Sequence, residues 1–208
     1  MRVFHVAPDR FVELGALPDA LPAQGFIWIG SARRVFEVGV PELQLALQRW
    51  GIAPLVDLHV ADLLNHQLPS HFDYTSWYDL MVFRRLAAAP GSSGLFVDEA
   101  HGTLASAMKA MQSIDTSPVG FAVFDRVLIT VHPTDCAVRE HFAQRLAGAG
   151  ARLPANPADL MLRMVNHMVD SYLDLRRLLT RQIGHRQQQL LDPRSRFDDW
   201  QVLLESRT

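Results

Sequence analysis

The longest regular hydrophobic pattern of the chain runs from Asn156 to Leu191. Asn156 is a favourable N-cap, Pro157 fits the first helical position, and Asp159 carries a charge that suits the positive end of a helix dipole. The apolar residues that follow are spaced in steps of four and three: Met161, Val165, Met168, Tyr172, Leu175, Leu179 and Ile183. This spacing places them on one face of a helix. The pattern predicts a single helix of about 36 residues, which would be roughly 54 Å long.

Two interpretations of this helix remain open. It is either a long core or bundle helix of the domain, or a helix that projects and packs against something large. After a break at Pro193, apolar residues again repeat at helical spacing up to the end of the sequence: Phe197, Trp200, Leu203 and Leu204. We therefore expect further helix from Arg194 onward, and we expect the chain to be a segment of a longer polypeptide.

Shorter patterns before residue 153 predict strands. The expected strands are Arg2–Ala7, Phe26–Gly30, Trp77–Leu86, Val119–Phe124 and Val127–His132. The last two carry apolar residues on both faces, which is typical of strands that lie between two layers of helices. They are separated only by Asp125 and Arg126, so we expect them to form a hairpin.

Helical patterns alternate with these strands. The expected helices are Pro41–Trp50, Pro54–Asn65, Glu99–Ile114 and a helix from Thr134 or Asp135 to Leu146, and the expected loops are Pro8–Gln24, Ala88–Gly94 and Gly148–Pro154. The fold class that follows is α/β: a mixed sheet between two helical layers, an α/β/α sandwich, at residues 1–153. Long helices follow at residues 154–208, and the family resemblance described below implies that they start a stalk.

Composition narrows the class of protein. Apolar residues make up 49% and charged residues 20% of the chain, so it can bury a sizeable core. The formal charge of -2 argues against a dedicated nucleic-acid binder. Cys136 is the only cysteine, which excludes an intramolecular disulfide and favours a reducing compartment. The sequence shows no secretory signal between Met1 and Pro8 and no apolar run long enough for a membrane helix.

The usual catalytic motifs are absent from the sequence. There is no phosphate-binding loop of the GxxxxGK[ST] type and no GxSxG nucleophile elbow. Cys136 follows a predicted strand at a helix start, four residues after His132, but a cysteine in that position usually packs. We therefore expect no enzyme, and we identify no catalytic residues.

Histidines and aspartates gather in the second predicted helix and just after it. They are Asp57, His59, Asp62, His66, His71 and Asp73. Asp62 and His66 are four residues apart, so they share one face of a helix. Carboxylate and imidazole ligands suit divalent cations, which makes Asp62 and His66 the candidate metal ligands. Because the spacing matches no strong zinc signature, an ordinary polar surface is the alternative.

Three passages carry a resemblance to a known family. The first is Asp62-Leu-Leu-Asn65-His-Gln67-Leu-Pro69, followed by Asp73-Tyr74 and the strand from Tyr78 to Arg84. The second is Val127-Leu-Ile-Thr-Val-His132, and the third is Met164 to Tyr172 of the long helix, followed by Asp192-Pro193. In order and spacing, over residues 26 to 208, they resemble the cytoplasmic part of CorA-type divalent-cation transporters.

The resemblance implies both an assembly and a regulation. The chain would be one wall of a homopentameric funnel on the cytoplasmic side of the membrane, attached through membrane helices that lie outside this sequence. Divalent cations bound between subunits would hold the funnel closed, and their loss would open it. Asp62 falls at the position of the family's acidic motif. The implied cofactor is a weakly bound regulatory Mg²⁺, Co²⁺ or Zn²⁺.

Departures from the family pattern concern the metal ligands and the ion. Leu68 and Ser70 replace the usual basic residues, and Asn166 stands where the family often has an aspartate. These differences are similar to those of a divergent branch, such as the zinc-transporting relatives. The alternatives are a soluble interaction protein that docks through its long amphipathic helix and a small hydrolytic enzyme.

Overall fold

The computed structural model describes residues 1–86 and 116–191. The predicted loop Ala88–Gly94, the predicted helix Glu99–Ile114 and the helix expected from Arg194 lie outside these residues. The chain divides into two compact units, of which the first comprises residues 1–95 and 114–169 and the second residues 96–113 and 170–208. The sheet and the candidate site belong to the first unit.

Seven strands within the described residues form one sheet. They are β1 (Arg2–Val6), β2 (Phe11–Leu14), β3 (Phe26–Ala32), β4 (His71–Tyr74), β5 (Asp79–Leu86), β6 (Thr116–Val123) and β7 (Val127–His132). Their order is β2-β1-β3-β7-β6-β5-β4. The β3–β7 pair is parallel and the other pairs are antiparallel, including the predicted hairpin of β6 and β7. The sheet is therefore mixed, as predicted.

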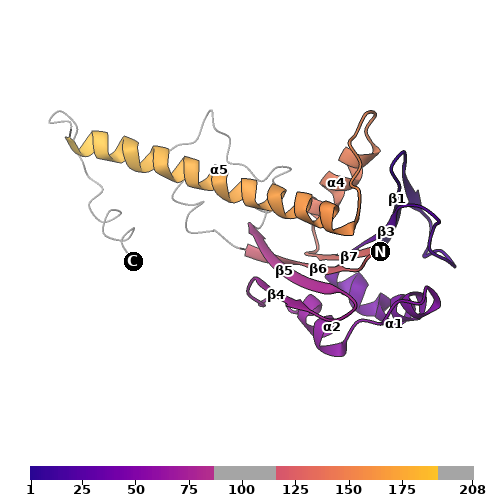
Figure 1. Ribbon diagram of the computed structural model, residues 1–208. Helices are drawn as coiled ribbons and strands as arrows, with labels where there is room; N and C mark the ends of the chain where they lie inside the picture. Colours follow the sequence, from indigo (N-terminus) through magenta and orange to yellow (C-terminus); the bar gives the residue numbers. More distant parts are fainter. Residues whose placement is uncertain (87–115, 192–208) are drawn as a thin grey trace. The chain divides into compact units, whose positions relative to one another are not determined.

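Helices cover both faces of this sheet (Figure 1). On one face, α1 (Arg33–Arg49) and α2 (Asp57–Leu64) bury Phe36, Leu43, Leu47 and Leu63 against the strands. On the other face lie α4 (Ala137–Ala147) and the first turns of α5 (Pro157–Leu191). They bury Phe142, Leu160, Met164 and Met168 in a second core cluster. The doubly apolar strands β6 and β7 thus lie between two helical layers, which confirms the α/β/α prediction.

The start of α5 follows the predicted capping pattern. The Asn156 side-chain oxygen accepts the backbone N–H of Asp159 at 2.8 Å, and an Asp159 carboxylate oxygen accepts the N–H of Ala155 at 2.9 Å. Two N–H groups at the helix start are satisfied in this way. The helix has 35 residues. The predicted bounds of the long helix are therefore confirmed.

The prediction that the first helix begins at Pro41 is wrong, because α1 begins eight residues earlier, at Arg33, and contains Pro41. Proline interrupts the hydrogen-bond pattern of a helix interior and fits the first helical position, which is why the sequence predicts a start at Pro41. The apolar residues of α1 stabilise the helix on both sides of Pro41. Phe36 is fully buried before the proline and Leu43 after it, so core packing on both sides holds the helix through the break.

Two strands occur where none was predicted. β2 lies within the segment predicted as a loop, and β4 immediately precedes the predicted strand β5. Both are four residues long and form the two edges of the sheet. An edge strand with polar side chains has little hydrophobic signal, because it is stabilised by pairing with one neighbour. The helix α2 also starts at Asp57 rather than Pro54, whereas its predicted end near Asn65 is confirmed.

Candidate metal site between α2 and β4

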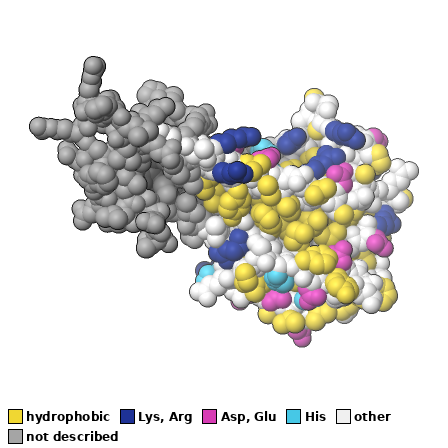
Figure 2. Space-filling model, turned by 60° about the vertical axis from the view of Figure 1, so that its left-hand side comes forward, with side chains coloured by type: hydrophobic (Ala, Val, Ile, Leu, Met, Phe, Trp, Pro, Cys, Tyr) yellow, Lys and Arg dark blue, Asp and Glu magenta, His cyan; other side chains and the backbone are white. Residues whose placement is uncertain are grey.

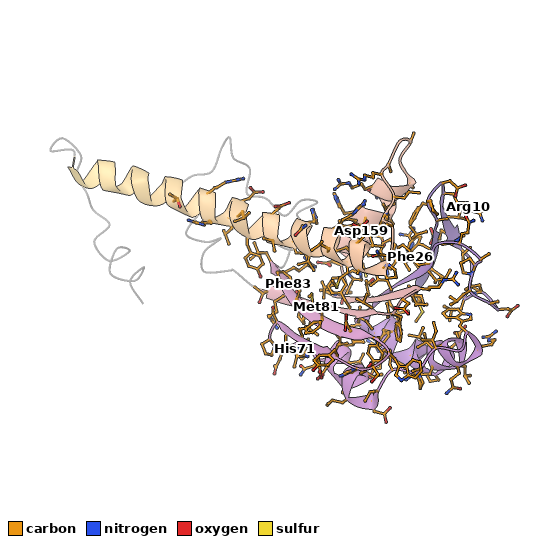
Figure 3. All side chains as sticks on the ribbon, in the orientation of Figure 1. Arg10, Phe26, His71, Met81, Phe83 and Asp159 are labelled. Atoms are coloured by element: carbon orange, nitrogen blue, oxygen red, sulfur yellow. The ribbon has the colours of Figure 1, made fainter. Side chains whose placement is uncertain are left out.

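Side chains of the predicted His/Asp cluster face each other from the helix α2 and the edge strand β4. His71 and Asp73 alternate with Phe72 in β4, so they point to the same face of the sheet. In Figure 3, His71 lies on the α2 side of the sheet, whereas Met81 and Phe83 of β5 lie on the opposite side. Figure 2 shows acidic and histidine side chains gathered beside a hydrophobic area of the surface.

His59 of α2 is committed to internal hydrogen bonds. Its side chain is buried, with Nδ1 2.8 Å from the Tyr78 hydroxyl and Nε2 3.1 Å from an Asp73 carboxylate oxygen. The Tyr78 hydroxyl accepts the backbone N–H of Val56 at 3.0 Å, so its own proton is available to Nδ1. Nε2 of the neutral ring then carries the proton and donates it to Asp73. His59 thereby links the start of α2 to β4.

Two hydrogen bonds stabilise the negative charge of the Asp73 carboxylate. The backbone N–H of Tyr74 donates to an Asp73 carboxylate oxygen at 2.7 Å, and His59 donates to the other oxygen. These bonds, the one from Tyr74 above all, hold the pKa of Asp73 below its usual range. The carboxylate is therefore ionised at neutral pH. Since Tyr74 uses its N–H in this bond, that group cannot pair with a further strand at the sheet edge.

Asp62 pairs with His71 rather than with the predicted His66. The Asp62 carboxylate lies 3.8 Å from Nε2 of His71, and the two side chains are 22% and 29% exposed. This separation is too long for a hydrogen bond. It is close to the roughly 3.3 Å that separates two ligand atoms bound to one tetrahedral Zn²⁺ at about 2.0–2.1 Å. Asp62 and His71 would need to approach each other by only about 0.5 Å to share such an ion.

His66 and Asp57, the remaining members of the predicted cluster, are exposed and do not approach Asp62 as His71 does. His66 is exposed in the segment after α2, and its carbonyl accepts a bond from Arg84 at 3.3 Å. Asp57 is exposed at the first position of α2. Among residues 1–86 and 116–191, no three His, Cys, Asp or Glu side chains are close enough together to hold a metal ion. The sequence indicates Asp62 and His66 as the ligand pair, with His71 as a further imidazole for Zn²⁺ or Co²⁺, but it does not predict β4, the strand that brings His71 to Asp62.

Arginines hold the backbone that follows α2. Arg33 donates to the carbonyl of Pro118 at 2.8 Å and, more weakly, to that of Leu63 at 3.5 Å. Arg84 donates to the carbonyl of Leu68 at 2.9 Å and to the Thr116 hydroxyl at 2.8 Å. Burial, followed by the charge of Arg84, lowers the pKa of Arg33. These bonds tie the C-terminal end of α2 to the sheet and so fix one side of the candidate site.

A buried polar network lies beneath α4. The Trp28 indole N–H donates to the Thr130 hydroxyl oxygen at 2.9 Å, and Nε2 of His132 lies 2.8 Å from the same oxygen. His132 is fully buried, and burial, followed by the charges of Arg139, Arg85 and Arg33, lowers its pKa to about 3. The imidazole is neutral at physiological pH.

Cys136 has the environment of a packing residue. It is buried, its thiol donates to the carbonyl of Pro133 at 3.3 Å, and burial raises the pKa of the thiol. A nucleophilic cysteine requires the opposite shift, toward the thiolate. Cys136 also has a left-handed backbone conformation, with φ at 50°, where it precedes the first residue of α4. This geometry does not support the use of Cys136 as a nucleophile.

Comparisons with known proteins define the class of fold. No protein-family model and no curated protein matches the sequence. Among solved structures, the full-length CmaX protein matches 100% of this chain at 18% identity with a TM-score of 0.65. The CorA magnesium transporter of Methanocaldococcus jannaschii matches 92% of it at 11% identity with a TM-score of 0.61. The soluble domain of that CorA matches 91% at 12% identity with a TM-score of 0.58.

The chain is an α/β protein with a mixed sheet and a long helix, and this fold is that of the soluble domain of CorA-type transporters. It covers 57% of CmaX, 51% of the complete CorA and 64% of the CorA soluble domain, so it spans only part of each. Within the described residues, none of the helices is both long and apolar enough to cross a membrane. The CorA structures in this comparison belong to a transporter and not to an enzyme.

Proposed function

We propose that the chain is the cytoplasmic regulatory part of a CorA-like transporter or channel for divalent metal cations. The observation that carries this proposal is the match of the fold along nearly the whole chain to a magnesium transporter and to its soluble domain. The motifs at Asp62, Val127 and Met164, which resemble the same family, support it. In this proposal, further parts of a longer protein supply the membrane segments and a homopentameric pore.

The regulatory step is the binding of an intracellular divalent cation, Mg²⁺, Co²⁺ or Zn²⁺, near Asp62 and His66. Mg²⁺ keeps most of its waters and binds through one or two carboxylates, so Asp62 can be its anchor. Zn²⁺ or Co²⁺ would use imidazole as well, and His71 then replaces His66 as the better-placed partner. The bound cation stabilises the closed arrangement of the subunits, and its loss shifts the population to the open one.

The experiment is a flux measurement on the longer protein, with Asp62→Asn as the test variant. We expect the variant to conduct, because Asp62 would regulate and not form the pore. Closure by Mg²⁺ should require several-fold higher Mg²⁺, since the variant lacks the carboxylate that anchors the ion.

A matched control is available on the same helix. Asp57→Asn removes an equal charge at the exposed first position of α2, and we expect it to leave the Mg²⁺ dependence unchanged. Equal Mg²⁺ inhibition in the wild type and in Asp62→Asn would remove Asp62 from the regulatory site. Absence of divalent-cation flux in the wild-type protein would contradict the proposed function itself.

A further inference from the structure

The helix α1 has a second apolar stripe on the face that points away from the sheet. Its inner face is fixed by Phe36, Leu43 and Leu47, which belong to the core cluster on the α2 side of the sheet. Val38 is 80% exposed, more than any other large hydrophobic residue in the part of the chain that the structure describes, and Leu45 is 63% exposed. The outer stripe follows helical steps of three and four and consists of Val35, Val38, Pro41 and Leu45.

Two opposite charges flank Val38 on the same outer face. Arg34 stands four residues before Val38 and Glu42 four residues after it, and both side chains are exposed. Within residues 1–86 and 116–191, neither Arg34 nor Glu42 makes an ion pair or a side-chain hydrogen bond. Along this face, a positive, an apolar and a negative side chain therefore follow one another at equal spacing.

This order of side chains is complementary to itself. When two α1 helices lie antiparallel about a two-fold axis at Val38, residues at equal distances before and after Val38 come level with each other. Arg34 of one copy then lies level with Glu42 of the other, and Val35 lies level with Pro41. A two-fold contact repeats each of these pairs, so it contains two Arg–Glu pairs around an apolar centre.

We propose that α1 is a self-association surface through which two copies of the chain pair by antiparallel α1 helices, with Val38 at the two-fold axis. Core packing already fixes the helix, so pairing requires no ordering of its backbone. One helix from each copy makes a small interface, and interfaces below about 1,200 Å² belong to the weak class. We therefore expect a dissociation constant on the order of 100 µM.

This contact goes beyond the function proposed above, since it uses neither Asp62 nor the β4 residues beside it. A ring of five identical subunits is built from head-to-tail contacts, in which two different surfaces of the subunit meet. A two-fold contact uses the same surface on both copies. In a ring assembly, the α1 contact would therefore join chains of two different rings.

The test is sedimentation velocity of the whole chain at low ionic strength, over concentrations from about 10 to 500 µM. We expect the wild type to pass from monomer to dimer in this range, and the dimer to weaken when salt is added, because salt screens exposed ion pairs. Arg34→Glu and Glu42→Arg should each raise the dissociation constant about tenfold, since both Arg–Glu pairs become pairs of like charge.

Mixing the two variants tests the antiparallel pairing itself. In a dimer of one Arg34→Glu chain and one Glu42→Arg chain, opposite charges face each other again at both positions. We expect the equimolar mixture to associate with the affinity of the wild type, although each variant alone is weakened. The chain that carries both substitutions should likewise regain its self-association.

The apolar centre is tested by Val38→Asp, which brings two carboxylates together at the two-fold axis, and we expect this variant to remain monomeric. The matched control is Leu58→Asp, which removes a 64% exposed apolar side chain from α2 and should leave the dissociation constant unchanged. Far-UV circular dichroism confirms that each variant is folded.

Three results would contradict the proposal. They are a wild type that stays monomeric at the highest concentration, self-association that is unchanged in Arg34→Glu or Val38→Asp, and a mixture of the charge variants that does not regain affinity. Equal loss of affinity in Leu58→Asp would also contradict it, because the copies would then meet through another surface.

Discussion

At the scale of single residues, the structure contains a buried histidine that links stability to pH. Unfolding returns the His132 imidazole to water, where its pKa is about 6.5, whereas burial lowers the pKa in the folded protein to about 3. Between these two values the unfolded state binds the additional proton. The free energy of unfolding must therefore fall as the pH drops below about 6.5, and above that pH His132 has no such effect.

We expect the substitution His132→Gln to flatten this dependence. In the wild type, the contribution of His132 approaches about 1.4 kcal/mol per pH unit once the unfolded state is protonated. The measurement is urea denaturation of both proteins at pH 7.5, 6 and 5, a range above the titration of most carboxylates. His66→Gln serves as the control, because His66 is exposed. A wild-type slope that persists in His132→Gln would assign the pH dependence to another group.

At the scale of elements, the position of α2 depends on a close approach to the sheet. A Cβ atom added at Gly120 in β6 would come within 2.3 Å of Leu63 Cδ2, and Leu63 is only 2% exposed. Gly120 therefore permits α2 to lie directly on the strand. This contact positions Asp62, the neighbour of Leu63, against His71.

Gly120→Ala should therefore destabilise the protein by about 1–3 kcal/mol, because Leu63 must move within a packed core. Gly15→Ala is the matched control, since a Cβ there meets no atom within 4 Å. Chemical denaturation of the two variants and the wild type gives the comparison. If both substitutions have the same small effect, α2 does not lie as close to β6 as described.

The elements also show how much could be predicted from the sequence. Central strands such as β7 and the long helix α5 have strong hydrophobic patterns and capping residues, so their type and bounds were predicted well. The edge strand β4 lacks such a pattern, because two of its side chains face solvent and its stability comes from pairing with β5. Because β4 was not predicted, the approach of His71 to Asp62 was not predicted either.

At the scale of the whole molecule, the chain has the fold of a known soluble domain. The mixed sheet between helical layers and the long helix match a magnesium transporter and its soluble domain along nearly the whole chain. This shared fold is the basis on which we propose the regulatory function.

The proposed role in divalent-cation transport is tested most directly by a flux measurement on the longer protein reconstituted in lipid vesicles. We expect divalent cations to cross the membrane when Mg²⁺ is low on the side that carries residues 1–208. We also expect the flux to fall when Mg²⁺ on that side is raised to millimolar concentration, because the bound cation favours the closed arrangement. A flux that does not respond to Mg²⁺ on that side, or no divalent flux under any condition, would contradict the proposed function.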